Sequence, residues 1–292
     1  MTIAIFGSPY PEHFTKYIQH LVKKLESEHV KIIIEENFNN FLQSNIRFTS
    51  TIDVFNSYES LKEKADFLIS IGGDGTLLKA VTYVRELNIP IMGINTGRLG
   101  FISSISATQI SDAINDILRK EYTINERTLL QLDTNKNLFK DKNFALNEVA
   151  VSKKDTSSMI RIDAFIDDEF LNTYWADGLV ISTPTGSTGY SLSCGGPIIV
   201  PGTNNIIITP NAPHNLNVRP IVINDNSVIK LKVEDRDQIA LVSLDSRSRA
   251  FDSKTELIIK KTDFKIKLIQ PQNNSFTSTI RNKLMWGLDK RT

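Results

Sequence analysis

The segment ISIGGDGTLLKA, which runs from Ile69 to Ala80, decides the expected fold of the first half of the chain. Its apolar start is typical of a buried strand, Gly72–Gly75 form a glycine-rich turn, and the residues from Thr76 onward are typical of a helix. Such a junction presents free backbone N–H groups and the positive end of a helix dipole, which suits an anion such as phosphate. Asp74 lies inside the turn, where its carboxylate would repel a phosphate. We therefore expect that Asp74 either shares a bridging metal ion with the phosphate or accepts the proton of the hydroxyl that attacks it.

The composition of the chain predicts a cytoplasmic protein. The chain has 292 residues, with 34 basic against 33 acidic side chains and a net charge of +1. This balance provides no electrostatic footprint for nucleic acid or a membrane surface, so we expect neither as a partner. The single cysteine, Cys194, cannot form an internal disulfide, which fits a reducing compartment. The first residues lack the pattern of a signal peptide, and no apolar run approaches the roughly 18 residues of a membrane span.

Up to Lys120, segments with the pattern of strands alternate with segments of helical period. This alternation predicts an α/β domain with an open, mostly parallel sheet. We interpret the segment between Asn37 and Tyr58 as a loop with a short helix. The other expected elements are the strands Ile3–Gly7, Val30–Ile34, Ala65–Ile71 and Pro90–Ile94 and the helices His13–Glu28, Thr76–Leu87 and Thr108–Lys120.

From Arg127 onward, short strand-like segments follow one another and few windows show helical period. This pattern predicts a mainly β, sandwich-like domain. Two of the segments, FALNEVAVS from Phe144 to Ser152 and EFLNTYWADGLVIST from Glu169 to Thr183, are each expected as a single strand. The tail from Ser278 to Leu288 has a helical pattern again.

The glycine-rich turn supplies the first group of candidate site residues. Gly72, Gly73 and Thr76 form the expected phosphate loop, although the spacing matches neither GxGxxG nor a P-loop with GK[ST]. Lys79 lies one helical turn further on. It is either a ligand of the anion or a solvated lysine on a surface helix.

Two polar segments of the second half supply the other candidates. Asn147–Glu148 interrupt an apolar strand, and the carboxylate either accepts hydrogen bonds from a ribose diol or faces water at a sheet edge. Asp177–Pro197 is dense in hydroxyls and small residues, which can bind adenine, ribose or phosphate, and loops of this length are more often functional than short ones. The four histidines show no metal-binding spacing, so the metal ligands are not identified.

These segments together resemble the NAD kinases of bacterial type. The family pattern is GGDGT, then NTGxLGF, then a strand with NE, then a long segment of the form DG-hydrophobic-ISTPTGSTAYSLSxGGP. The chain carries these motifs in the same order at Gly72–Thr76, Asn95–Phe101, Asn147–Glu148 and Asp177–Pro197. The resemblance implies transfer of the γ-phosphate of ATP to the 2′-hydroxyl of the adenosine ribose of NAD⁺, giving NADP⁺, with Mg²⁺ as the metal.

The resemblance also implies roles for residues of this chain. Asp74 would be the general base and, with Gly75, would contact NAD, and we place Lys79 in the same binding set. Asn147 and Glu148 would bind the ribose of NAD. Asp177 would contact the base or the nicotinamide end, and the adenosine would contact the run Thr188, Gly189, Tyr190, Ser191, Leu192 and Ser193.

The architecture implied by the resemblance is that of NAD kinases and diacylglycerol kinases. Residues 1–124, with 272–292 returning to them, would form the α/β domain that carries the GGDGT turn. Residues 125–271 would form the β-rich NAD-binding domain. Family members are typically dimers or tetramers, so a homodimer or homotetramer is expected.

Two departures from the family pattern and two alternative functions accompany this interpretation. Gly189 stands where the family commonly has alanine. Leu244–Arg249 (LDSRSR) replaces a D-G-Q run, so that Arg247 or Arg249 either meets phosphate or is exposed on a loop.

The first alternative function is a lipid kinase of the diacylglycerol type, which shares the GGDGT turn but needs an apolar groove for acyl chains. The second is a non-catalytic NAD-binding module.

Overall fold

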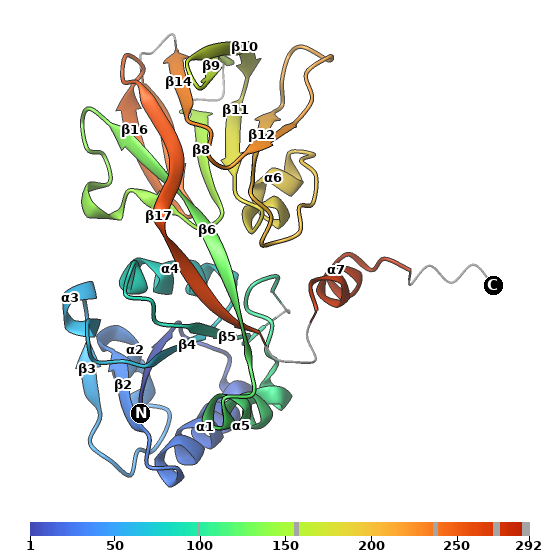
Figure 1. Cartoon of the computed structure of the whole chain (residues 1–292). Coiled ribbons are helices and arrows are strands. Elements are labelled where there is room, and N and C mark those ends of the chain that lie inside the picture. The colour runs from blue at the N-terminus through green and yellow to red at the C-terminus, as the bar shows by residue number, and fades with distance from the viewer. Residues whose placement is uncertain (98–99, 155–157, 236–238, 271–274, 288–292) are drawn as a thin grey trace. The chain divides into compact units, whose positions relative to one another are not determined.

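The structure is a computed structural model (Figure 1). The chain divides into two compact units. The structure describes residues 1–97, 100–154, 158–235, 239–270 and 275–287. The first unit consists of Met1–Glu126 and Ile266–Thr292, and the second of Arg127–Lys265. Strands β6 (Thr123–Thr134) and β17 (Leu257–Gln270) each continue from one unit into the other.

The first unit is built on a parallel sheet with the strand order β3-β2-β1-β4-β5, and the end of β17 pairs with β5. Its central strands are short apolar runs because helices cover both faces of the sheet. Helices α1 and α5 pack on one face, and α4 lies on the other (Figure 1). The elements are β1 (Thr2–Gly7), η1 (Glu12–Phe14), α1 (Thr15–Ser27), β2 (Lys31–Glu35), α2 (Glu36–Gln43), β3 (Asp53–Phe55), α3 (Tyr58–Leu61), β4 (Phe67–Ile71), α4 (Asp74–Val84), β5 (Ile91–Ile94), η2 (Ala107–Gln109), α5 (Ile110–Arg119) and α7 (Phe276–Leu284).

The segment between Asn37 and Tyr58 contains more structure than the expected loop with a short helix. The carboxylate of Glu35 caps α2 by accepting the N–H of Phe38 at 2.9 Å. The ring of Phe38 is buried in the same core as α1 and α5. Residues Asp53–Phe55 then pair in parallel with β2 as strand β3. A strand of this length is too short for a periodic pattern to reveal, so the expectation of a loop is wrong for these residues.

The second unit is a β sandwich. One sheet has the order β10-β9-β14-β17 and the other the order β13-β12-β11-β8-β15-β16, both antiparallel. Burial alternates along β9 and β14, and their inward side chains meet those of β8, β11 and β15 in one core. The elements are η3 (Lys140–Lys142), β7 (Phe144–Ala145), β8 (Glu148–Lys153), β9 (Ile160–Ile166), β10 (Glu169–Ala176), β11 (Gly178–Ser182), η4 (Gly186–Thr188), α6 (Tyr190–Ser193), β12 (Asn205–Asn211), β13 (Ile221–Asn224), β14 (Ile229–Glu234), β15 (Ile239–Leu244) and β16 (Arg247–Asp252).

Both segments that were expected as single strands are divided. The chain changes sheet at Asp177, because β10 pairs with β9 in one sheet while β11 pairs with β8 and β12 in the other. The other segment is divided into β7 and β8 at Leu146–Asn147. There the backbone N–H groups donate to the carboxylate of Asp245 rather than to a neighbouring strand. The interpretation of Asn147–Glu148 as the middle of a continuous strand is therefore wrong.

The tail forms α7, which begins with a capping box. The hydroxyl of Ser275 accepts the N–H of Ser278 at 3.1 Å, and this bond satisfies one of the free donors of the first turn. The expected helix runs from Ser278 to Leu288, whereas α7 spans Phe276–Leu284 and ends at a left-handed C-cap, Met285; Leu288 lies outside the described residues. Within the described part of the chain, every helix falls short of the length and apolar character needed to cross a membrane.

Candidate active site

The glycine-rich turn joins β4 to α4 in the first unit. Gly73 has an extended backbone and is the N-cap of α4, whose first residue is Asp74. Gly72 has a φ of +151°, and a methyl group there would collide with the side chain of Thr76. Only glycine therefore fits this position without strain. The Thr76 hydroxyl is hydrogen-bonded to that of Ser8 at 2.9 Å, which anchors the turn to the loop after β1.

The carboxylate of Asp74 is held by backbone N–H groups of a neighbouring loop. Its Oδ2 accepts the N–H of Phe101 at 2.8 Å, and its Oδ1 accepts that of Ser103 at 2.9 Å. The N–H of Ile102 lies further from Oδ1, at 3.3 Å. A carboxylate group has about four acceptor positions, so a position on Oδ2 is left for another donor. Asp74 therefore has a fixed orientation together with capacity for one more hydrogen bond.

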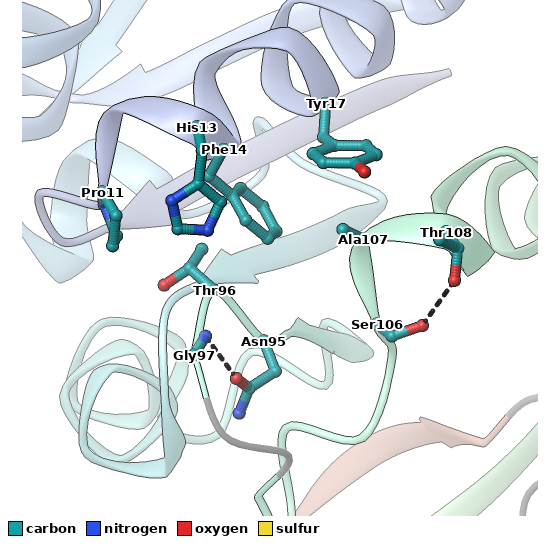
Figure 2. Close-up of a pocket in the computed structure, with 10 residues that line it drawn as sticks. All are labelled: Pro11, His13, Phe14, Tyr17, Asn95, Thr96, Gly97, Ser106, Ala107 and Thr108. Carbon is teal, nitrogen blue, oxygen red and sulfur yellow. Dashed lines mark hydrogen bonds between the residues drawn. The ribbon is translucent and has the colours of Figure 1, made fainter.

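Asn95 holds the same loop from its other end. Its Nδ2 donates to the carbonyl of Ser103 at 3.3 Å, and its Oδ1 accepts the N–H of Gly97 at 2.7 Å. The second of these bonds is drawn in Figure 2. Residues 98–99 of the NTGRLGF segment lie outside the described residues. The side chain of Asn95 thus contributes to the position of the backbone that binds Asp74.

A pocket of about 440 Å³ opens at the carboxyl ends of β1 and β5, with Asn95 on its wall (Figure 2). The rings of His13, Phe14 and Tyr17 form another part of the wall, and Thr96 lies among the remaining lining residues. The volume is within the range of small-molecule sites, and open α/β sheets bind ligands at this edge. Apart from the NTGRLGF segment, the residues singled out in the sequence lie outside this pocket.

The outer side of the glycine-rich turn is open. A methyl group on Gly73 or Gly75 would have no neighbouring atom within 4 Å among the described residues. The side chain of Lys79 is exposed on α4, one turn from the N-terminus of this helix. An anion can therefore approach the helix N-terminus, and Lys79 is near enough in the chain to assist.

In the second unit, the Asn147–Glu148 corner is held by the carboxylate of Asp245. This side chain is 4% exposed and lies in the turn between β15 and β16. Its Oδ1 accepts the N–H of Asn147 at 2.8 Å, and its Oδ2 accepts that of Leu146 at 3.1 Å. The N–H of Glu148 lies 3.3 Å from Oδ1. Three consecutive N–H groups are thus directed at one carboxylate, which turns the chain sharply at this point. Burial raises the pKa of Asp245.

Glu148 is a buried carboxylate with an unsatisfied acceptor. The residue is 8% exposed. Burial and, second, the negative charge of Asp245 raise the pKa of Glu148 to about 7, and a backbone hydrogen bond from Tyr190 opposes this shift. Among the described residues, neither Oε2 of Glu148 nor Oδ1 of Asn147 has a hydrogen-bond partner. Leaving buried acceptors unpaired is costly, so two of them on consecutive residues indicate a site for a ligand with two donors.

The hydroxyl-rich segment packs directly on this corner. It is not one long loop, since it forms η4 and α6, which meet at Gly189. A methyl group on Gly186 would collide with the main chain of Asn147, and the N–H of Thr183 donates to the Asn147 carbonyl at 2.9 Å. A methyl group on Gly189 would lie 3.1 Å from Oε2 of Glu148 and 3.4 Å from Nδ2 of Asn147. A methyl group at residue 189 would therefore narrow the space beside Oε2 of Glu148, one of the two unpaired acceptors.

The rest of the predicted adenosine run differs in exposure. Ser191 is buried and hydrogen-bonded to the hydroxyl of Thr209 at 2.9 Å. The ring of Tyr190 is exposed, and its hydroxyl accepts a hydrogen bond from Asn211 at 2.9 Å. Thr188 and Leu192 are half-buried, and Ser193 is exposed. The structure therefore brings the beginning of the run close to Asn147 and Glu148 and gives Ser191 an internal partner.

Asp177, at the point where the chain changes sheet, forms an ion pair with Lys153 at 2.6 Å. Its charge contributes to the raised pKa of Tyr190, after burial and the charge of Cys194. Asp177 and Tyr190 therefore lie near enough for their charges to interact. The ion pair with Lys153 is a partner that the sequence does not reveal.

Arg247 is neither on an exposed loop nor free to meet phosphate. Its guanidinium donates to the main-chain carbonyls of Lys142 and Phe144 and lies 3.9 Å from Asp245. It therefore fixes the segment that leads into β7. Arg249 is exposed and donates to the neighbouring carbonyl of Ser248 at 2.9 Å.

Comparison with known proteins identifies the family. The model of the ATP-NAD kinase N-terminal domain matches residues 3–122, and that of the ATP-NAD kinase C-terminal domain matches residues 146–271. The chain belongs to the NAD kinase family. The NAD kinase of Flavobacterium psychrophilum is 50% identical over 293 residues, and that of Christiangramia forsetii is 47% identical over 293 residues; each match covers 100% of both chains. The NAD kinase of Porphyromonas gingivalis is 40% identical over 285 residues, or 98% of both chains.

Solved structures of the NAD kinase family share the fold. Yeast NADH kinase complexed with NADH superimposes with a TM-score of 0.87 at 22% identity and covers 98% of this chain and 88% of that one. An NAD kinase from Archaeoglobus fulgidus in complex with ATP has a TM-score of 0.74 at 25% identity over 98% of both chains. The predicted family and fold class, an α/β domain with a mostly parallel sheet and a β sandwich, are confirmed. The alternatives, a lipid kinase and a non-catalytic module, are not favoured.

The residues of this NAD kinase family member fit a Mg²⁺ ion that arrives with a nucleotide, and they do not fit a metal enclosed by the protein. Across the described ranges, no three His, Cys, Asp or Glu side chains form a group that could hold a metal. Asp74 belongs to the turn and has an open acceptor position on Oδ2. Magnesium sites of kinases commonly use one or two carboxylates together with substrate phosphates and water.

Asp245 is the residue of this site that the sequence reasoning did not single out. The sequence marks the segment Leu244–Arg249 only as a departure from the family pattern. An aspartate between two alternating segments indicates a hairpin turn, and such a residue ordinarily bonds to its own turn. Its actual partner, Asn147, lies 98 positions earlier in the chain. A pattern of neighbouring residues carries no signal for a contact of this kind.

Proposed function

We propose that the protein transfers the γ-phosphate of ATP to the 2′-hydroxyl of the adenosine ribose of NAD⁺, giving NADP⁺. Membership of the NAD kinase family supports this reaction. The observation that carries the proposal in this chain is the pair of buried acceptors without donors, Oδ1 of Asn147 and Oε2 of Glu148. The two neighbouring hydroxyls of a ribose that is not itself being phosphorylated supply two donors for these two acceptors.

Asp74 is the proposed general base. Its open acceptor position on Oδ2 would receive the proton of the 2′-hydroxyl. The N–H groups of Phe101 and Ser103 would keep the carboxylate from rotating during the transfer. General-base help is typically worth about 10²–10⁴ in rate. The rest of phosphoryl transfer depends on positioning and on stabilisation of the phosphate charge.

The phosphates of ATP would bind at the open side of the turn formed by Gly72, Gly73 and Thr76, with Gly75 against NAD and Lys79 as a nearby cation. The open space outside Gly73 and Gly75 supports this placement. Mg²⁺ would be held mainly by the ATP phosphates and water, because the open position of Asp74 is taken by the 2′-hydroxyl, and when bound it would neutralise phosphate charge.

The β-rich domain, residues 125–271, is the proposed NAD-binding domain, and residues 1–124 with 272–292 form the domain of the glycine-rich turn. Asn147 and Glu148 would bind the ribose, Thr188–Ser193 the adenosine, and Asp177 the base or the nicotinamide end. The packing of the Gly186–Gly189 segment on the corner supports the adenosine placement. We further propose a homodimer or homotetramer in the cytoplasm, where the single thiol of Cys194 stays reduced.

The test is NADP⁺ formation from NAD⁺, ATP and Mg²⁺, coupled to an NADP-specific dehydrogenase. We expect turnover by the wild type and a loss of about 10²–10⁴ in kcat for Asp74→Asn with an unchanged circular dichroism spectrum. Near wild-type turnover by this variant would remove Asp74 from the role of base. If the wild type forms no NADP⁺ but phosphorylates diacylglycerol in vesicles, the lipid kinase alternative replaces the proposal. If it binds NAD⁺ and consumes no ATP, the non-catalytic module does.

A further inference from the structure

Arg127, near the start of the second unit on β6, is a half-buried cation without an acidic partner among the described residues. Its Nη1 lies 3.5 Å from Oγ1 of Thr185, a long contact with a neutral group. Its Nε is buried and has no hydrogen-bond partner. Burial lowers the pKa of Arg127 to about 10, with no contribution from a neighbouring carboxylate.

Two other partly buried arginines of the sandwich, Arg161 and Arg247, have the partners that Arg127 lacks. Arg161 pairs with Asp163 at 2.8 Å and with Glu234 at 2.7 Å. Arg247 donates to two main-chain carbonyls and lies 3.9 Å from Asp245. A cation that is removed from water without such compensation costs free energy of folding. The position of Arg127 is therefore not explained by a contribution to stability.

Arg127 contacts a segment that also packs on the Asn147–Glu148 corner. Its neighbour Thr185 is buried and belongs to the segment between β11 and η4. Two residues earlier in that segment, Thr183 donates its N–H to the carbonyl of Asn147 at 2.9 Å and its hydroxyl to the carbonyl of Leu146 at 2.6 Å. The guanidinium of Arg127 thus lies against the same segment that packs on the two unpaired acceptors.

We propose that Arg127 is a phosphate-binding residue of the substrate site, with the phosphate supplied either by the diphosphate of the dinucleotide or by the triphosphate of ATP. This inference rests on the proposed function. A guanidinium matches phosphate oxygens with two parallel N–H groups, of which Nε–H is one, and Nε is the unpaired atom here. A bound phosphate would supply a negative charge and hydrogen-bond acceptors for the guanidinium of Arg127. The described residues of the free protein provide no negative charge there and no acceptor for Nε.

The first test compares thermal unfolding of the wild type, Arg127→Met and Arg127→Lys, each with and without inorganic tripolyphosphate. Methionine removes the charge and keeps much of the length. We expect the free Met variant to unfold at the wild-type temperature or above it, because an uncompensated cation is removed. We expect tripolyphosphate to stabilise the wild type most, the Lys variant less and the Met variant least, because only the phosphate site proposed at the glycine-rich turn remains in the Met variant.

Arg161→Met is the matched control, because it removes a paired guanidinium from the same unit. It should lower the unfolding temperature and keep the full response to tripolyphosphate. If Arg127→Met behaves like this control, or fails to fold, Arg127 is a structural residue and the proposal is overturned. Full stabilisation of Arg127→Met by tripolyphosphate would overturn it as well.

The second test separates the two sources of phosphate by kinetics. Arg127→Met should raise one KM at least roughly tenfold, because hydrogen bonds to a charged group have effects of this order. A rise in the KM for NAD⁺ assigns the residue to the dinucleotide, and a rise in the KM for ATP assigns it to the donor. Unchanged values for both would overturn the proposal. A wild type that responds to tripolyphosphate through Arg127 but makes no NADP⁺ would refute the proposed function and leave this inference standing.

Discussion

The protonation of Glu148 should make both stability and NAD⁺ binding depend on pH near neutrality. Burial and the charge of Asp245 raise the pKa of Glu148 from its ordinary value of 4.5 to about 7 in the folded protein. Between these values the folded protein keeps a proton that the unfolded chain has already released. The free energy of unfolding contributed by Glu148 therefore falls as the pH rises through this window.

The magnitude follows from the size of the shift. A difference of about 2.5 pH units at roughly 1.4 kcal/mol each corresponds to about 3 kcal/mol between pH about 4.5 and pH about 7. The two carboxylates titrate as a coupled pair, so the measured midpoints belong to Glu148 and Asp245 together. The other titratable groups that act on this site are Tyr190 and Cys194, whose own pKa values are raised.

The assay is urea unfolding at a series of pH values for the wild type and Glu148→Gln. The variant carries no titrating carboxyl at position 148, so the difference in the free energy of unfolding between the two proteins should change by about 3 kcal/mol across the window. Glu169→Gln, which replaces an exposed side chain of the same unit, is the control and should follow the wild type. A difference that stays constant from about pH 5 to about pH 8 would refute the argument that burial and Asp245 hold the proton on Glu148.

The same group should affect catalysis through substrate binding. An ionised Glu148 offers more acceptor positions to ribose hydroxyls than a protonated one. The KM for NAD⁺ should therefore fall as the pH rises through about 7 in the wild type and remain flat in Glu148→Gln. A wild-type KM for NAD⁺ that is independent of pH would contradict the assignment of Glu148 to the ribose.

Three further predictions, which use four substitutions, test the local geometry. Asp245→Asn removes an acceptor of the corner, so we expect the KM for NAD⁺ to rise more than that for ATP; equal changes in both would indicate a general loss of structure. Its effect should combine non-additively with that of Asn147→Ala, measured as a double-mutant cycle. Gly189→Ala places a methyl group 3.1 Å from Oε2 of Glu148. This should raise the KM for NAD⁺ by less than roughly tenfold, since the carboxylate can shift by a few tenths of an ångström. An unchanged KM would show that NAD⁺ does not use the space beside Gly189. Asn95→Ala removes two bonds of the loop that holds Asp74 and should lower kcat with a destabilisation of about 1–3 kcal/mol, measured by urea unfolding; an unchanged kcat would separate the loop from catalysis.

The fold was predictable wherever it rests on residues that are neighbours in the sequence. Strands β1, β4 and β5 are apolar runs because both of their faces are covered, and the strand–turn–helix junction at Gly72 follows from glycine between an apolar run and a helical period. Strand β3 was not predictable, because three residues carry no period. The same holds for the change of sheet at Asp177, since two strands on either side of one residue have the pattern of a single longer strand.

The family, the two kinds of domain and the polar segments can be identified from the amino-acid sequence, because each is recorded in a short run of residues. How those segments are held depends on contacts between residues that are far apart in the chain. The chain turns at Asn147 because the carboxylate of Asp245, 98 positions away, accepts the N–H of Asn147. Asp74 has one open acceptor position because N–H groups of a separate loop occupy its other acceptor positions. The proton on Glu148 and the unpaired charge of Arg127 likewise depend on burial and on distant partners. These are properties of packing, and chain neighbours do not encode them, since desolvation and hydrogen bonding are set by whatever the fold brings within a few ångströms.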